Sequence, residues 1–222
     1  MGSIELWDNL IQLAVSGISS LWALWLYRKG HARHFSFLCG ALMCWSLGLT
    51  YWLLYFTLRG YSPPEPSPAN FAWSGSHLFL ISVALSMASD EERTWHPPLA
   101  LLAPALTLPF TYTWFSLGEV TSPTINLLWG LGFAVLSYVS LRGLMYAHRQ
   151  RHRRRVLYHA LVLALVLFNE IMLHISLFLW PEDYLHFNGY YAFDMPVTLM
   201  LALLTPALIH AAAEGPITIV HT

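Results

Sequence analysis

A carboxylate and two histidines stand inside segments that are otherwise apolar. Glu170 and His174 lie near the middle of the apolar run 157–180, and His77 lies in an earlier apolar run. A charged side chain is costly within a bilayer unless it is paired, protonated or hydrated, so these residues mark a candidate functional site. Carboxylate and imidazole groups can exchange a proton, bind a cation or ligate a metal.

Helical periodicity groups these residues further. At about 100° per residue, His159, Glu170 and His174 fall within roughly 60° of one helix face, so we expect them to form a polar stripe that faces the bundle interior. Asn169 points about a quarter-turn away and is expected to contact a neighbouring helix. His77 and His174 each lie about six residues inside the outer ends of their runs, so we expect them to face each other across the bundle.

The composition predicts that the elements carrying these residues cross a membrane. Hydrophobic residues make up 56% of the chain and charged residues 10%, whereas charged residues are roughly a quarter of a soluble protein. The mean hydropathy is +0.51. Seven apolar runs are long enough to span a bilayer: 9–27, 35–58, 71–88, 99–117, 125–146, 157–180 and 195–212. We therefore expect an all-α membrane protein, a single polytopic domain (1–222) built as a seven-transmembrane-helix bundle.

The distribution of charge predicts the orientation of this bundle. Basic residues cluster in three connections, at Arg28 to Arg33, at Arg93 and in the tract 149–155, while Arg59 is the only basic residue in the other connections. Basic loops stay in the cytoplasm, so we expect the N-terminus outside and the C-terminus cytoplasmic, in the plasma (inner) membrane. The tract 149–155 is expected to fix this topology and to contact lipid headgroups; no nucleic-acid partner is expected.

Acidic residues gather at the opposite, outer side. They include Glu5, Asp8 and Asp194, which we expect outside the apolar runs. Asp194 closes the outer connection 181–194, which is rich in aromatic residues and includes Tyr190 and Tyr191. Aromatic faces beside acids suit an organic cation or an amphipathic ligand, although such a segment can also rest on lipid headgroups.

These patterns favour a membrane protein that binds a small molecule or ion in an outward-facing intramembrane polar cavity, as a sensor or transporter. A cytoplasmic or membrane protein partner would relay any signal. The expected ligand-binding residues are Glu170, His174, His77, Asn169, Tyr190 and Tyr191.

An intramembrane metal-dependent hydrolase is the first alternative. Glu170 and His174 are four residues apart on one helix face, and His77 is a conceivable third ligand, leaving an open position on zinc for an activated water. The helix count resembles that of the seven-helix zinc hydrolases of the alkaline ceramidase and adiponectin receptor type. Their seventh helix carries an HxxxH pair, whereas His210 is the only histidine of run 195–212, so no residue role is carried over.

Two further alternatives use the same residues differently. His159 and His174 are fifteen residues apart, close to the spacing at which one helix ligates two b-type haems, with His77 and His210 as opposing ligands in an electron-transfer subunit. In a purely structural subunit the polar groups would only hold helices together. Retinal is excluded because the only lysine, Lys29, lies in a loop.

Small residues predict one close helix contact. Gly40, Cys44 and Gly48 recur at every fourth position of run 35–58. Such a face lets two helix backbones approach closely, so we expect a neighbouring helix to pack tightly along it.

Overall fold

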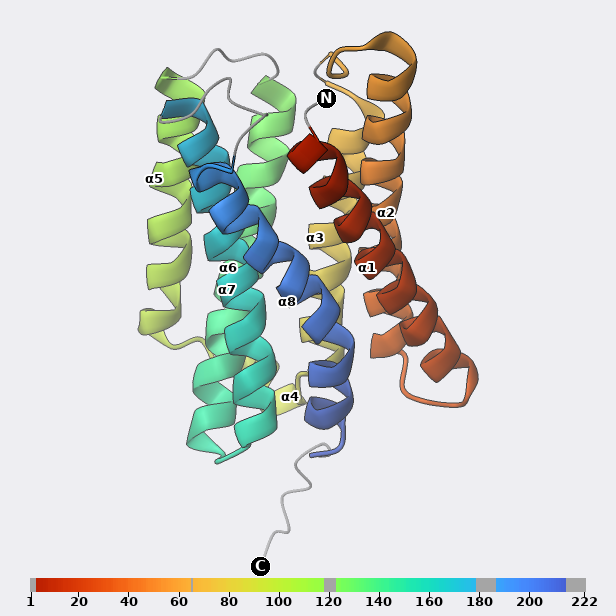
Figure 1. The fold of residues 1–222 in the computed structure, drawn as a ribbon. Helices are drawn as coiled ribbons and strands as arrows, with labels where there is room; N and C mark the ends of the chain where they lie inside the picture. The colour runs from red at the N-terminus through yellow and green to blue at the C-terminus, as the bar shows by residue number, and fades with distance from the viewer. Residues whose placement is uncertain (1–2, 65, 118–122, 179–186, 215–222) are drawn as a thin grey trace, which may run out of the picture.

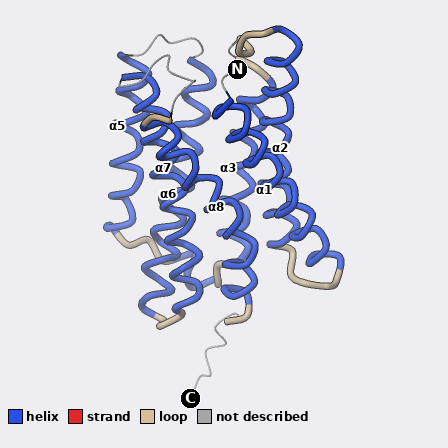
Figure 2. The backbone as a smooth tube through the Cα atoms, viewed as in Figure 1, coloured by secondary structure: helices blue, strands red, loops and turns tan. Residues whose placement is uncertain are grey.

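The computed structural model describes residues 3–64, 66–117, 123–178 and 187–214; for Ser3, 110–117, 123–126 and 173–178 it covers the backbone alone. This part of the chain is helical and contains no strand (Figures 1 and 2). A 3-10 turn, Pro98–Leu101, precedes α5. The helices are α1 (Ser3–Arg28), α2 (His34–Arg59), α3 (Pro68–Met87), α4 (Asp90–Thr94), α5 (Leu102–Leu117), α6 (Pro123–Arg149), α7 (Arg153–Phe178) and α8 (Gly189–Ala212).

The expectation of an all-α membrane protein is confirmed. Within the described residues, five helices are long and apolar enough to cross a bilayer, namely α1, α2, α6, α7 and α8. The chain is therefore a multi-pass membrane protein. Two predicted runs do not meet this criterion. Helix α5 has only 16 residues, and the first half of α3 carries the polar residues Asn70, Ser74 and His77, which lower its hydropathy. Seven spans and their orientation remain predictions.

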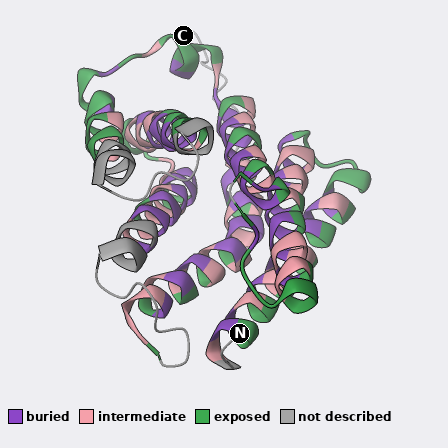
Figure 3. Ribbon diagram, turned by 90° about the horizontal axis from the view of Figure 1, so that it is seen from above, coloured by how far each residue is buried: buried purple, intermediate pink, exposed green. Residues whose placement is uncertain are grey.

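Six of the helices pack in a ring. Successive contacts join α1 to α2, α2 to α3, α3 to α6, α6 to α7 and α7 to α8, and the contact of α8 with α1 closes the ring. Helix α5 packs mainly on α6. Seen from above, buried residues lie along the faces that these helices turn toward one another (Figure 3). The buried aliphatic core runs through the ring and includes Leu42, Leu136, Leu165 and Leu204.

The close contact predicted along α2 is made with α3. A Cβ atom added at Gly48 would lie 2.5 Å from Nε1 of Trp73, and one added at Gly40 would lie 2.9 Å from the ring of Phe79. Both distances are shorter than real Cβ contacts allow. The absence of a side chain at these glycines therefore lets two aromatic rings of α3 lie against the α2 backbone, which confirms the prediction.

The two ends of the bundle differ in charge. Helix α1 begins at one end and α8 finishes at the other (Figure 1). We call the first the N-terminal end. The second, where α1 ends at Arg28 and α7 begins at Arg153, we call the basic end. There the Glu214 carboxylate accepts hydrogen bonds from the backbone N–H groups of Arg154 and Arg155, both at 3.1 Å, and so ties the end of α8 to the start of α7.

Candidate functional site

The polar stripe of α7 faces inward where it is described. His159 and Glu170 are both buried, as the stripe predicts, and Asn169 is buried beside them. The His174 side chain lies outside the described residues. Its approach to Glu170 and to His77 therefore stays a prediction, and so does the use of these residues as ligand-binding groups.

His77 is buried among aromatic rings of α6. Its ring centroid lies 4.6 Å from that of Phe133 and 6.4 Å from that of Trp129, and it packs against the backbone at Gly132. Neither ring nitrogen finds a hydrogen-bond partner in the described part of the chain. The described contacts of His77 thus turn toward α6.

The metal and haem hypotheses gain no support from the described residues. No group of three His, Cys, Asp or Glu side chains that could hold a metal ion occurs among them; the set His77, Glu170 and His174 was not covered, because His174 lies outside. His159 is buried against Gly143, whereas His210 is exposed near the end of α8. That pair is therefore not placed like two ligands of one buried haem.

The structure instead brings together acids that the sequence interpretation had placed outside the apolar runs. Helix α1 begins at Ser3, so Glu5, Asp8 and Gln12 lie in its first turns, spaced i, i+3 and i+7 on one face. All three are buried. The expectation that Glu5 and Asp8 lie outside the first membrane helix is therefore wrong, because α1 begins before both residues and packs this face against α8.

Asp194 was also misplaced. It was expected in the outer connection, but α8 begins at Gly189, where the Asn188 side chain accepts a hydrogen bond at 2.9 Å from the backbone N–H of Tyr190. This N-cap starts the helix before Asp194. The predicted run began too late because Asp194 and the tyrosines before it lower the local hydropathy. Tyr190 and Tyr191 accordingly belong to the first turn of α8.

A hydrogen-bond network joins α1, α2 and α8 at this place. The side chains of Asp8 and Asp194, 6% and 5% exposed, lie within hydrogen-bonding reach of each other. Gln12 Nε2 donates to Asp194 Oδ1 and to Thr198 Oγ1, both at 3.0 Å. Trp45 Nε1 of α2 donates to Gln12 Oε1 at 2.9 Å. Both ends of the Gln12 amide are thus fixed, and its orientation is determined.

We call Glu5, Asp8, Gln12 and Asp194 the carboxyl cluster. Carboxylate oxygens only accept hydrogen bonds, so these two carboxyl groups can bond to each other only when one of them holds a proton. Oδ2 of Asp8 is buried and receives no hydrogen bond from any N–H or O–H donor of the described residues. The sequence of α8 contains no Lys or Arg, and that of α1 contains only Arg28 at its far end. No basic side chain of these two helices neutralises the acids.

The aromatic residues predicted to bind a ligand lie beside the carboxyl cluster. Tyr190 is within electrostatic range of Asp194, Asp8 and Glu5. The ring of Tyr191, which is buried, lies 5.3 Å from the ring of Tyr190 in an edge-to-face arrangement. The cluster therefore combines buried carboxyl groups with a phenol and an aromatic face.

Comparisons with protein-family models, with curated proteins and with solved structures give no match. The chemistry of this protein is therefore argued from its own geometry.

Proposed function

We propose that this multi-pass membrane protein binds a cation, either a proton or a small organic cation, at the carboxyl cluster, and acts as a sensor or transporter. The observation that carries this proposal is the close approach of two buried carboxyl groups, Asp8 and Asp194, contributed by two helices that are far apart in sequence. A carboxyl pair buried in a helix bundle must keep a proton or take a cation in its place.

The surroundings suit the exchange of a proton for a cation. Oδ2 of Asp8 is a buried acceptor without an N–H or O–H donor in the described chain, and Thr198 Oγ1 supplies a neutral oxygen nearby. The Tyr190 ring adds an aromatic face, which favours an organic cation. Gln12, fixed by Trp45, keeps Asp194 in place whether or not the proton is present.

The position of the cluster favours access from outside. Asp8 is five residues from the start of α1, so it lies about 7.5 Å from that end of the helix. The basic end carries the arginines that favour a cytoplasmic location, which would place the N-terminal end outside the plasma membrane. The cluster would then form the floor of a shallow, outward-facing polar cavity.

The predicted residues of α7 extend this site. The ring of Phe168 lies 5.7 Å from the ring of Phe193, so the turn of α7 that holds Asn169 and Glu170 lies beside the turn of α8 that holds Asp194. We propose that Glu170, with His174 and His77, forms a second, neighbouring binding site for a proton or ligand.

Infrared difference spectroscopy of the protein in nanodiscs tests the proposal. A shared proton gives the C=O band of a protonated carboxylic acid, and we expect raised pH or added tetramethylammonium ions to remove it. Asp8→Asn and Asp194→Asn should each abolish this response while keeping the helical fold. Asp90→Asn is the matched control, because Asp90 is an exposed acid at the basic end.

Two results would contradict the proposal. One is an acid band that survives unchanged in both Asp8→Asn and Asp194→Asn. The other is a wild-type band that neither a change of pH nor added tetramethylammonium alters.

A further inference from the structure

A second group of ionisable side chains is buried at the basic end, about as far from the carboxyl cluster as the bundle allows. We call it the arginine cluster, although it includes one acid and two histidines. Its members come from α2, α4, α6 and α7 and are His34, Glu92, Arg142, Arg155 and His159. Arg142 and Arg155 are only 5% and 7% exposed, unlike the exposed arginines of the same end.

Packing holds the two α7 members in place. The ring of His159 lies so close to Gly143 that a Cβ atom at that position would overlap it. Arg155 Nη2 donates a hydrogen bond at 2.6 Å to the carbonyl oxygen of Met87, the last residue of α3. This bond satisfies one of the free carbonyl groups at the α3 C-terminus.

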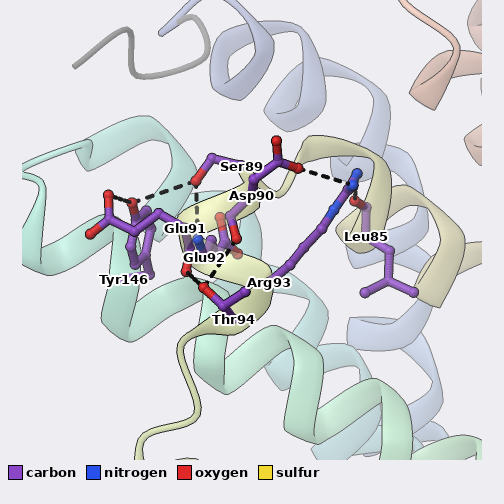
Figure 4. Close-up of polar contacts among 8 residues, drawn as sticks. All are labelled: Leu85, Ser89, Asp90, Glu91, Glu92, Arg93, Thr94 and Tyr146. Carbon is purple, nitrogen blue, oxygen red and sulfur yellow. Dashed lines mark hydrogen bonds and ion pairs between the residues drawn. The ribbon is translucent and has the colours of Figure 1, made fainter. Parts of the chain in front are cut away.

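The short helix α4 carries Glu92, and polar contacts hold this helix in place (Figure 4). The Ser89 side chain caps α4 by accepting a hydrogen bond from the Glu92 backbone N–H at 3.1 Å. Tyr146 of α6 donates its phenol hydrogen to Glu91 Oε2 at 2.9 Å. Helix α4 is thereby fastened to α6, which carries Arg142, and Glu92 is held on the inner side.

The charges of this cluster do not balance. Arginine stays protonated in proteins, so Arg142 and Arg155 contribute two positive charges against the single carboxyl group of Glu92. Burial raises the pKa of Glu92, and the Arg155 and Arg142 guanidinium groups offset that rise only in part. Within the described residues, the ion pair closer than 4 Å is Arg93 with Asp90, so Glu92 forms no such pair with either buried arginine.

Several hydrogen-bonding nitrogens of the cluster are also unused. Nε of Arg142, Nε of Arg155, Nδ1 of His159 and Nε2 of His34 are buried, and none has a hydrogen-bond partner in the part of the chain that the structure describes. Arg155 and Arg142 lie within electrostatic range of His159, and Arg155 lies within range of His34. Two buried guanidinium groups that share one carboxyl group leave one positive charge without a counter-charge, which is strongly unfavourable.

We propose that the arginine cluster binds a phosphate group, taken either from an anionic lipid headgroup or from free phosphate. A phosphate offers several acceptor oxygens and up to two negative charges, which match two guanidinium groups and adjacent imidazoles. Arg155 lies in the first turn of α7, and the exposed arginines 149, 151, 153 and 154 attract anions to this end. The site is separate from the carboxyl cluster and does not depend on it.

Thermal unfolding of the whole chain tests this inference in two arms. In the first, inorganic phosphate is titrated into protein in a neutral detergent, against chloride at equal ionic strength. In the second, nanodiscs of phosphatidylcholine are compared with nanodiscs that also contain phosphatidylglycerol. We expect stabilisation in at least one arm. If free phosphate is the ligand, it should stabilise the protein in detergent. If a lipid headgroup is the ligand, only the nanodiscs that contain phosphatidylglycerol should stabilise it.

Three variants separate binding from general attraction. Arg142→Gln should lower the affinity for the ligand that stabilises the wild-type protein by at least about tenfold, because it removes about one charge-assisted hydrogen bond. Arg149→Gln removes the same charge from an exposed position of the same helix and should change the affinity little. Glu92→Gln removes the competing carboxylate and should tighten binding, an effect that a purely structural role of Glu92 would not produce.

The inference is overturned if neither arm stabilises the wild-type protein, or if Arg149→Gln weakens binding as much as Arg142→Gln. If Arg142→Gln fails to fold, the two wild-type experiments and the Glu92→Gln variant still test the inference. Unchanged or weaker phosphate binding in Glu92→Gln also overturns it.

Discussion

The carboxyl cluster and the arginine cluster bury charged groups at opposite ends of one helix ring by different means. At the N-terminal end, neutral donors position the acids: Trp45 holds Gln12, and Gln12 holds Asp194. At the basic end, packing and a backbone contact position the groups: the His159 ring packs against Gly143, and Arg155 donates a hydrogen bond to a backbone carbonyl. The framework of the carboxyl cluster is thus made by uncharged groups, whereas buried nitrogens of the arginine cluster have no hydrogen-bond partner in the described part of the chain.

Asp194→Ala should have the largest effect, because it tests whether the carboxyl cluster is one network. The substitution removes the partner of Asp8 and leaves Gln12 Nε2 with one acceptor fewer. Leaving buried polar groups unpaired destabilises by about 2–4 kcal/mol. Asp194→Asn is the control, since its amide can still accept from Gln12 and donate to Asp8. Unfolding in detergent measures both; equal stability of the two variants would show that the network does not hold the helices.

Gly143→Ala probes the arginine cluster by packing instead of by hydrogen bonding. The added methyl group overlaps the His159 ring, so the ring or the α6–α7 contact must shift, at about 1–3 kcal/mol. Gly17→Ala is the matched control, because a Cβ atom there would be 3.9 Å from Ser46 Oγ, an ordinary contact. Thermal unfolding of both variants measures the difference. A Gly143→Ala protein as stable as Gly17→Ala would mean that shape does not fix His159.

The helices themselves were predictable from the sequence, because apolar runs and small-residue spacing report on them directly. The face of Gly40, Cys44 and Gly48 predicted the close approach of α3, since only packing is involved. The inward position of His159 and Glu170 followed from helical angles in the same way.

The carboxyl cluster was not predictable from the runs as drawn. The run beginning at residue 9 excluded Glu5 and Asp8, because acids lower the hydropathy of a window even when they lie inside a helix. Had α1 been extended to Ser3, the i, i+3, i+7 spacing of Glu5, Asp8 and Gln12 would have shown a polar face. The hydrogen bond from Gln12 to Asp194 joins residues 182 positions apart, a tertiary contact that helical angles within one segment cannot supply.

Trp45→Phe should have a smaller effect, because it removes one support of the carboxyl cluster without touching an acid. The indole N–H bond to Gln12 Oε1 is lost while most of the ring volume stays, so we expect about 1 kcal/mol of destabilisation. The loosened amide should also weaken the cation response of the Asp8 carboxyl band. Trp22→Phe, at an exposed position of α1, is the control for loss of an indole. If the cation response of Trp45→Phe matched that of the wild type, Gln12 would not need Trp45 to orient Asp194.

Glu92→Gln should give the smallest effect, because opposing influences act on this carboxyl group. Burial raises the pKa of Glu92 above its usual 4.5, and the guanidinium groups of Arg155 and Arg142 counteract part of that rise. The folded protein thus holds this proton more tightly than the unfolded chain. The stability that it contributes is complete below the usual Glu pKa and is lost as pH rises through the folded pKa.

Glu92→Gln cannot ionise, so its stability relative to the wild type should increase as the pH is raised through the folded pKa. Unfolding measured across that pH range, in a buffer free of phosphate, checks this dependence. Asp90→Asn is the control, because Asp90 is exposed on the same short helix. A difference between Glu92→Gln and wild type that stays constant with pH would mean that Glu92 remains ionised throughout. Glu92 itself would then compensate one of the two positive charges of the buried arginines, and a bound phosphate would be needed to compensate only the other.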